Sequence, residues 1–162
     1  MHDHRIENLK AKFSVIVCSS TRNKDNDTSG QEINSALREA GHDVTYYEVV
    51  KDDPDAVKDA VETALRQSDC LIISGGTGIT SHDVTIETVR SIAEKEIHSF
   101  STLFALLSYQ QIGTSAIMSN SSAFLVNRKP VFCLPGSPSG ASLGVKGIIL
   151  KEIDHILHES RR

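Results

Sequence analysis

Short runs of apolar, β-branched residues alternate along this chain with stretches of helical periodicity. We predict four strands from these runs, at residues 13–18, 44–50, 70–73 and 130–134. Alternating strands and helices are typical of right-handed β-α-β units, which build a mostly parallel sheet. The pattern therefore predicts an α/β fold.

Helical periodicity fills the gaps between the predicted strands. The first helix is expected to start at a cap formed by Thr28 or Ser29 and to end at Gly41. Pro54 is expected in the first turn of the second helix. A long final helix is predicted over residues 140–158, where apolar residues keep helical spacing.

The segment 100–126 interrupts this rhythm. It carries two helix-like stretches, around 100–107 and 116–126, which Gly113 and Thr114 separate, and no strand is predicted between them. Such an inserted helix pair can belong to the core. Alternatively, it can bury its surplus apolar surface against a second copy of the chain. The sequence leaves both interpretations open.

Composition and charge limit the classes of partner. With 162 residues, 39% of them hydrophobic, the chain can form one globular domain. The formal charge of −4 and the absence of a run rich in lysine and arginine disfavour nucleic acid as a partner. No apolar run approaches the roughly 20 residues that span a bilayer, so we expect no membrane partner. The three cysteines lie in apolar strand-like runs, as reduced core residues do, and we expect a cytoplasmic protein.

Polar loops follow four of the predicted strands, at residues 19–30, 51–55, 74–83 and 135–138. Ligands of parallel sheets bind at the carboxyl ends of the strands, so these loops should meet at one edge. That arrangement would gather the carboxylates of Asp25, Asp27, Asp52, Asp53 and Asp83. Clustered carboxylates need a compensating cation, and Mg²⁺ bound with a nucleotide would supply it.

The third of these loops contains Gly75-Gly76-Thr77-Gly78. Glycines let successive backbone N–H groups face a ligand, and a helix predicted to start near Val84 would add its positive dipole end. An anion is therefore the expected ligand. Neither a Walker P-loop nor a complete G-x-G-x-x-G motif is present, which disfavours a dinucleotide-dependent hydride-transfer enzyme.

Each of these features also has a purely structural interpretation. The glycines can form a tight turn, and Asp83 can cap a helix. Asp52 and Asp53 can be turn and first-turn residues before Pro54, and Ser137 or Ser139 can cap the final helix. The hypothesis of a site depends on all four loops being required together at one edge.

Four motifs, in their order along the chain, resemble the molybdenum cofactor biosynthesis protein B/Mog family, the molybdopterin adenylyltransferases. The motifs are Asp27-Thr28-Ser29-Gly30, Lys51-Asp52-Asp53, residues 74–87 with Ser-Gly-Gly-Thr-Gly and Asp-Val-Thr-Ile-Glu, and Leu134-Pro135-Gly136-Ser137-Pro138. The resemblance covers about residues 12–158. It implies a three-layer α/β sandwich with helices on both faces of the sheet. It also implies a single domain over residues 1–162, with residues 1–11 as a flexible N-terminal extension.

The resemblance implies Mg²⁺-dependent transfer of AMP from ATP to the terminal phosphate of molybdopterin. The catalytic residues, and the ligands of Mg²⁺, would be Asp52 and Asp83. The nucleotide phosphates would bind at Gly75, Gly76, Thr77 and Gly78. Molybdopterin would bind at Asp27, Ser29, Gly30, Pro135, Gly136, Ser137 and Pro138. The family's partners would be further copies of the chain, as a trimer or a dimer of trimers, and the molybdate-inserting molybdenumtransferase.

Several positions depart from the family pattern, among them His98-Ser99, where the family usually has Pro-Gly. Ser20, His82 and Asn120 stand where many members have an aspartate and two arginines. The lost guanidinium groups would remove bidentate contacts to phosphate. This keeps a second hypothesis open, a molybdopterin-binding carrier with little transferase activity, and a third, an enzyme of another phosphorylated metabolite. The candidates to replace the missing positive charge are Arg22, Lys24, Arg128 and Lys129.

Overall fold

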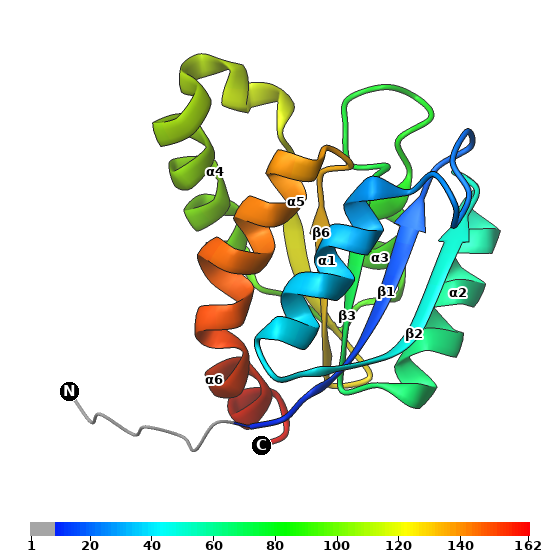
Figure 1. The fold of residues 1–162 in the computed structure, drawn as a ribbon, viewed down its shortest axis with the longest axis vertical. Coiled ribbons are helices and arrows are strands. Elements are labelled where there is room, and N and C mark those ends of the chain that lie inside the picture. Colours follow the sequence, from blue (N-terminus) through cyan, green and yellow to red (C-terminus); the bar gives the residue numbers. More distant parts are fainter. Residues whose placement is uncertain (1–8) are drawn as a thin grey trace.

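The computed structural model describes residues 9–162, which form one six-stranded sheet (Figure 1). The strands lie in the order β2-β1-β3-β6-β5-β4. Neighbours among β2, β1, β3 and β6 are parallel, whereas β5 is antiparallel to β6 and β4 to β5. The strands are β1 (Lys12–Cys18), β2 (Asp43–Val50), β3 (Cys70–Ser74), β4 (Lys95–Glu96), β5 (Ser122–Val126) and β6 (Lys129–Leu134). The predicted mostly parallel sheet is confirmed.

Helices cover both faces of the sheet, which confirms the three-layer α/β sandwich (Figure 1). One face carries α1 (Thr28–Glu39), α4 (His98–Ile112), α5 (Pro138–Gly144) and α6 (Leu150–Ser160). A π-helical segment, Val145–Ile149, joins α5 to α6. The other face carries α2 (Pro54–Gln67) and α3 (Thr85–Ile92). Within residues 9–162, no helix is both long and apolar enough to cross a membrane.

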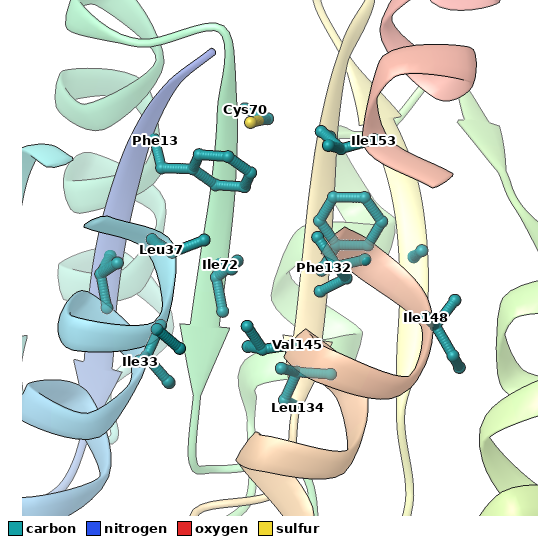
Figure 2. Close-up of a cluster of buried hydrophobic side chains, with 14 of the residues drawn as sticks. Phe13, Ile33, Leu37, Cys70, Ile72, Phe132, Leu134, Val145, Ile148 and Ile153 are labelled. Carbon is teal, nitrogen blue, oxygen red and sulfur yellow. The ribbon is translucent and has the colours of Figure 1, made fainter. Parts of the chain in front are cut away.

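The central strands are buried on both sides. Alternate residues of β1 enter different clusters, since Phe13 packs under α1 whereas Ile16 packs under α2. On the α1 face, Figure 2 shows Ile72 and Phe132 of the sheet facing Ile33 and other helical side chains. Burial on both faces explains why these strands read as continuous apolar runs in the sequence.

The prediction of a helix around residues 116–126 is wrong. Residues Gly113–Met118 form a 3₁₀ helix, and β5 follows as an antiparallel strand. A tight turn at Asn127 and Arg128, both with positive φ, returns the chain into β6. A short apolar run does not distinguish a strand from a buried helix, because its few residues fit either period. The pairing with β6 decides between them here.

The helix ends were predicted less accurately than the helices themselves. Asp27, and not Thr28 or Ser29, caps α1, whereas Gly41 follows the end of that helix at φ +90° as expected. Pro54 begins α2 as predicted. The predicted final helix begins slightly earlier, at Pro138.

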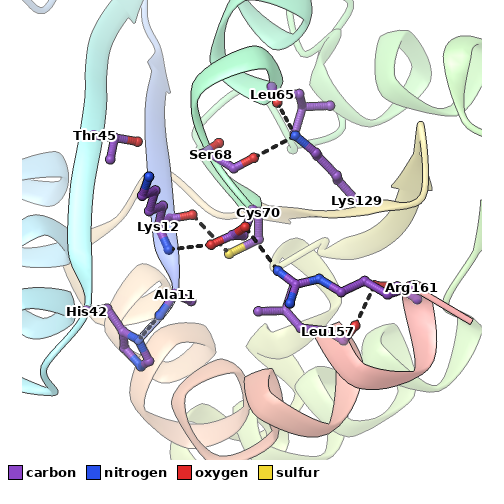
Figure 3. Close-up of polar contacts among 12 residues, drawn as sticks. Ala11, Lys12, His42, Thr45, Leu65, Ser68, Cys70, Lys129, Leu157 and Arg161 are labelled. Carbon is purple, nitrogen blue, oxygen red and sulfur yellow. Dashed lines mark hydrogen bonds and ion pairs between the residues drawn. The ribbon is translucent and has the colours of Figure 1, made fainter. Parts of the chain in front are cut away.

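Polar contacts tie together the amino ends of the parallel strands (Figure 3). The backbone N–H of Lys12 donates to Asp69, and Arg161 forms an ion pair with the same carboxylate at 3.0 Å. The ammonium group of Lys129 donates to the carbonyls of Leu65 and Ser68, near the end of α2. This end of the sheet is occupied by structural contacts, so the loops at the carboxyl ends remain for a ligand.

The predicted flexible extension 1–11 is too long. Its residues 1–8 lie outside the described residues. Leu9 packs against the core, and Ala11 is fully buried and donates its N–H to Nδ1 of His42 at 3.2 Å. Residues 9–11 therefore belong to the folded domain, because Ala11, just before β1, forms hydrogen bonds with His42 and Asp43 at the start of β2.

Candidate functional site

Loops from four parallel strands meet around one cavity of about 780 Å³. The prediction that these loops converge is confirmed, and Figure 1 shows three of them at the same end of the sheet. Met118, the last residue of the 3₁₀ helix, and Ser119 after it add a further wall. The cavity is lined by Val17 and Cys18 at the end of β1 and Ser19–Arg22 after it, Asp52 after β2, Gly75–Gly78, His82 and Asp83 after β3, and Pro135–Ser137 after β6.

The turn after β3 requires its first two glycines. Gly75 and Gly76 have φ values of +94° and +68°, which disfavour any other residue. A Cβ on Gly75 would lie 2.4 Å from the carbonyl oxygen of Cys18, and one on Gly76 would lie 2.3 Å from Oγ1 of Thr85. The tight-turn interpretation is therefore correct for both residues, and it does not exclude an anion.

The available backbone donors are fewer than the sequence suggested. The N–H of Gly75 donates to the carbonyl of Leu134, and that of Thr85, the first residue of α3, donates to the carbonyl of Gly76. No hydrogen bond within the described residues uses the N–H of Gly76 or Thr77. Within the glycine turn, these two N–H groups are the candidate donors for an anion, whereas no residue of α3 lines the cavity.

Asp83 lies against the glycine turn and does not cap α3. Val84 occupies the N-cap position, with no side-chain hydrogen bond. Oδ2 of Asp83 accepts hydrogen bonds from the hydroxyl and the N–H of Thr80, at 2.7 and 3.0 Å. A Cβ on Gly78 would lie 2.7 Å from this carboxylate. The Thr80 hydroxyl, more than any other group, holds the pKa of Asp83 below its usual value, so the carboxylate is charged at neutral pH.

Asp52 and Asp53 have different roles. The hydroxyl of Ser20 donates to Oδ2 of Asp52 at 3.0 Å, and the Asp52 side chain lines the cavity. Its Oδ1 lies beside Gly76, where a Cβ would approach it to 3.2 Å. Asp53 instead caps α2 by accepting the N–H of Ala56 at 2.9 Å. The structural interpretation therefore holds for Asp53, whereas Asp52 faces the site.

Asp27 is a structural residue in this fold. It is fully buried, accepts the N–H of Gly30 at 3.0 Å, and accepts the hydroxyl of Tyr47. Burial and this carboxylate raise the pKa of Tyr47. Neither Asp27 nor Asp25 lines the cavity. The predicted cluster of five carboxylates is therefore reduced to two, because Asp27 and Asp53 are helix caps and Asp25 does not line the cavity.

The residues predicted to bind molybdopterin divide between two places. Pro135, Gly136 and Ser137 line the main cavity, and Ser137 also caps α5 through the N–H of Gly140. Ser29 and Pro138 line a separate groove of about 390 Å³ between α1 and α5. The Ser29 hydroxyl, in this groove, donates to the carbonyl of Gly136, in the main cavity, at 2.8 Å, so the groove and the cavity are linked by a hydrogen bond. Gly30 lines neither, and its missing Cβ leaves room for the Asp27 carboxylate.

Of the four candidate replacement cations, Arg22 is the one at the cavity. Its Nη1 donates to the carbonyl of Gly136 at 3.3 Å. Lys129 binds carbonyls at the other end of the sheet, and the guanidinium of Arg128 contacts the carbonyl of Arg161. Lys24 lies over the ring of Tyr47, 5.8 Å from its centre.

Other residues of the site were not found from the sequence. Thr80 holds Asp83, and Ser20 holds Asp52; both are close in sequence to predicted positions, but a hydroxyl in a loop gives no specific signal. Met118 and Ser119 come from a segment that was predicted to be helical, and no motif marks them. The Cys18 thiol also lines the cavity, but burial raises its pKa to about 11, so it stays protonated near neutral pH.

The two cavity carboxylates are a limited set of metal ligands. Across residues 9–162, no group of three or more His, Cys, Asp or Glu side chains is placed to hold a metal ion. Oδ1 of Asp52 accepts no hydrogen bond from the described residues, whereas the Asp83 carboxylate accepts hydrogen bonds from Thr80 and from the N–H of Gly78. This donor set fits a hard cation that takes its other ligands from water and from substrate phosphates, as Mg²⁺ commonly does.

Residues 14–155 match a protein-family model that describes a probable molybdopterin binding domain. The chain belongs to this family. Among related members of known name, the molybdenum cofactor biosynthesis protein B of Bacillus cereus is 40% identical over 156 residues, which cover 94% of this chain and 92% of that protein. The Bacillus subtilis protein of the same name is 39% identical over 154 residues, with coverage of 93% and 91%.

Solved structures agree with this molybdopterin-binding domain assignment. A crystal structure of a molybdenum cofactor biosynthesis protein B has a TM-score of 0.92 at 40% identity, covering 96% of this chain and 99% of that chain. The tungsten cofactor synthesizing protein MoaB of Pyrococcus furiosus has a TM-score of 0.87 at 33% identity, covering 94% and 98%. The family predicted from the four motifs is confirmed.

Proposed function

We propose that this chain acts in molybdenum cofactor biosynthesis by transferring AMP from ATP to molybdopterin, with release of pyrophosphate. One observation carries the proposal: Asp52 and Asp83 lie beside Gly76 and Gly78 of the same glycine turn, inside one cavity. Two carboxylates beside free N–H groups form a place where a cation and a phosphate chain can bind together. The relatives' names supply the metabolic setting.

Each group of the turn has a distinct role in this proposal. Oδ1 of Asp52 and Oδ1 of Asp83 hold Mg²⁺ or its water ligands, and the N–H groups of Gly76 and Thr77 bind the nucleotide phosphates. When bound, Mg²⁺ would supply positive charge that stabilises the phosphate oxygens while the α-phosphorus is transferred from pyrophosphate to the acceptor. Ser20 and Thr80 keep the two carboxylates oriented, so little rearrangement is needed during the reaction.

The acceptor molybdopterin binds, in this proposal, at the loop after β6. Gly136 lies directly against the glycine turn, because a Cβ on Gly136 would approach Cα of Gly75 to 3.2 Å. An acceptor phosphate held at Pro135–Ser137 would therefore be next to the nucleotide phosphates. The terminal phosphate of molybdopterin is the nucleophile. Placing it close to the phosphates of ATP requires that the negative charge of both groups be neutralised locally.

We further propose that the chain self-associates through α4, as a trimer or a dimer of trimers. Six of the seven large hydrophobic side chains that are exposed within residues 9–162 lie on α4 and the 3₁₀ helix after it. Exposed apolar side chains gathered on neighbouring elements often mark a contact with another protein. A molybdate-inserting molybdenumtransferase, which would receive the adenylylated product, is the second partner that we propose.

The proposal is tested by incubating the purified protein with molybdopterin, Mg²⁺ and ATP labelled at the α-phosphate. We expect label in the pterin product and an equal amount of pyrophosphate. Tight binding of molybdopterin without transfer of label would contradict the enzyme and would indicate the carrier. Absence of both would contradict the transferase and the carrier alike.

A further inference from the structure

Positive charge is scarce in the main cavity. Among its lining residues in the described part of the chain, Arg22 is the one lysine or arginine, and His82 is the one histidine. Asp52 and Asp83 contribute two negative charges to the same space. An anionic ligand in such a cavity needs local cations, because each unpaired charge loses hydration when it is enclosed.

The backbone of the loop after β1 holds Arg22 in place. Its N–H donates to Oγ of Ser19 at 3.1 Å, and so does the N–H of Thr21 at 3.3 Å. These local contacts form a compact turn directly after β1. The side chain therefore starts from a fixed position at the carboxyl edge of the sheet.

The guanidinium of Arg22 lies where the loop after β3 and the loop after β6 meet. Its Nη1 donates to the carbonyl of Gly136, and Gly136 packs against Gly75. The Ser29 hydroxyl donates to the same carbonyl, so this oxygen has a second donor without Arg22. A guanidinium has five N–H donors in a planar fork. One contact to Gly136 leaves the others for oxygens of a ligand.

We propose that Arg22 is the phosphate-binding cation of this cavity. It keeps one N–H on the Gly136 carbonyl and donates the others to phosphate oxygens between the loop after β3 and the loop after β6. Arg22, in the loop after β1, thereby supplies a guanidinium group to a cavity in which the loop after β3 offers only the imidazole of His82. This inference rests on the proposed function, because it assigns the residue that neutralises the phosphates of the two substrates.

The test measures binding and does not depend on turnover. The probes are ATP with Mg²⁺ and inorganic pyrophosphate, titrated calorimetrically into the wild type, Arg22→Gln and Arg22→Lys. Removing a charge-assisted contact to phosphate is expected to weaken binding of both probes about 10-fold or more in Arg22→Gln. Arg22→Lys should lie between the two, because it keeps the charge and loses the fork. Binding to Arg22→Gln should also depend less on salt than binding to the wild type.

Arg66→Gln is the matched control. Arg66 is exposed in the last turn of α2, outside the cavity, and its substitution changes the net charge equally. Equal weakening in Arg66→Gln and Arg22→Gln, or unchanged binding in Arg22→Gln, would overturn the assignment. The thermal midpoint of each variant without ligand checks that the domain is folded. Should Arg22→Gln be unfolded, Arg22→Lys decides. Wild-type affinity of Arg22→Lys for both probes would overturn the proposal that the guanidinium of Arg22 binds the phosphates.

The two proposals fail in different ways. A wild type that binds both probes through Arg22 but transfers no AMP would contradict the transferase and leave the role of Arg22 intact. A wild type that transfers AMP, with unchanged probe binding in Arg22→Gln, would contradict the role of Arg22 and leave the transferase intact.

Discussion

Gly75 and Gly41 have nearly the same positive φ in different surroundings. Their φ values are +94° and +90°. A Cβ on Gly75 would meet the Cys18 carbonyl oxygen at 2.4 Å, whereas a Cβ on Gly41 would have no neighbour within 4 Å. The pair separates the cost of a left-handed backbone from the cost of a steric clash.

We expect Gly41→Ala to lower the free energy of unfolding by about 1–2 kcal/mol, the cost of the left-handed conformation alone. Gly75→Ala should lower it by roughly 1–3 kcal/mol more, because the backbone carbonyl of Cys18 has to move. Denaturant titration of both variants measures the difference. Equal losses would show that the turn after β3 can widen without cost.

Asp83 and Asp53 are acidic residues with different partners in neighbouring loops. The pKa of Asp83 is lowered mainly by the Thr80 hydroxyl, so Asp83 is charged throughout the neutral range. If it holds Mg²⁺, Asp83→Asn should slow AMP transfer on the order of 100-fold at limiting Mg²⁺, and less at saturating Mg²⁺. Asp53→Asn should transfer AMP normally, because asparagine also caps a helix. Full transfer by Asp83→Asn at limiting Mg²⁺ would remove Asp83 from the proposed metal site.

The sequence predicted where the acidic residues would gather, but not which of them would face the ligand. Strand order alone places Asp27, Asp52, Asp53 and Asp83 at one edge of a parallel sheet. Asp27 and Asp53 instead accept N–H groups of α1 and α2. That choice depends on where each helix starts to within one residue, and helix ends are the least certain part of a sequence-based prediction.

At the scale of whole elements, strong periodicity predicted the type of element correctly, whereas the short apolar run of β5 did not. Pro54 marked the start of α2 correctly, and the continuous runs of β1 and β3 gave nearly correct boundaries. β5 was predicted to be helical, because its pairing with β6 is not encoded in its own five residues. The wall of the cavity formed by Met118 and Ser119 was missed for the same reason, since it leads into this strand.

The exposed side of α4 gives a prediction at the element scale. Leu106 and Tyr109 are 53% and 58% exposed on this helix. If copies of the chain associate here, Leu106→Glu should shift the mass measured by light scattering towards the monomer, because it places a charge in an apolar contact. Ile79→Glu is the control, since Ile79 is 66% exposed on the loop after β3. An unchanged mass for Leu106→Glu, or an equal change for Ile79→Glu, would place the interface elsewhere.

At the scale of the whole molecule, the cavity exists only in the folded chain. Its walls come from positions as distant as Cys18 and Ser137, which the parallel sheet brings to one edge. The opposite edge is tied by contacts such as the ion pair between Arg161 and Asp69. A ligand that contacts loops from four strands therefore binds the native state and not the unfolded chain, so its binding adds directly to the free energy of unfolding.

This linkage gives a test that needs no molybdopterin. With ATP and Mg²⁺ at about 100 times the dissociation constant, stability should rise by about 2.7 kcal/mol. For a domain of this size, that corresponds to a rise in the thermal midpoint of roughly 5–11 °C. ATP with excess EDTA should give a clearly smaller rise, because Asp52 and Asp83 then face the triphosphate without a cation between them. Equal shifts with Mg²⁺ and with EDTA, measured by calorimetry, would show that the two carboxylates do not bind the nucleotide through a metal ion.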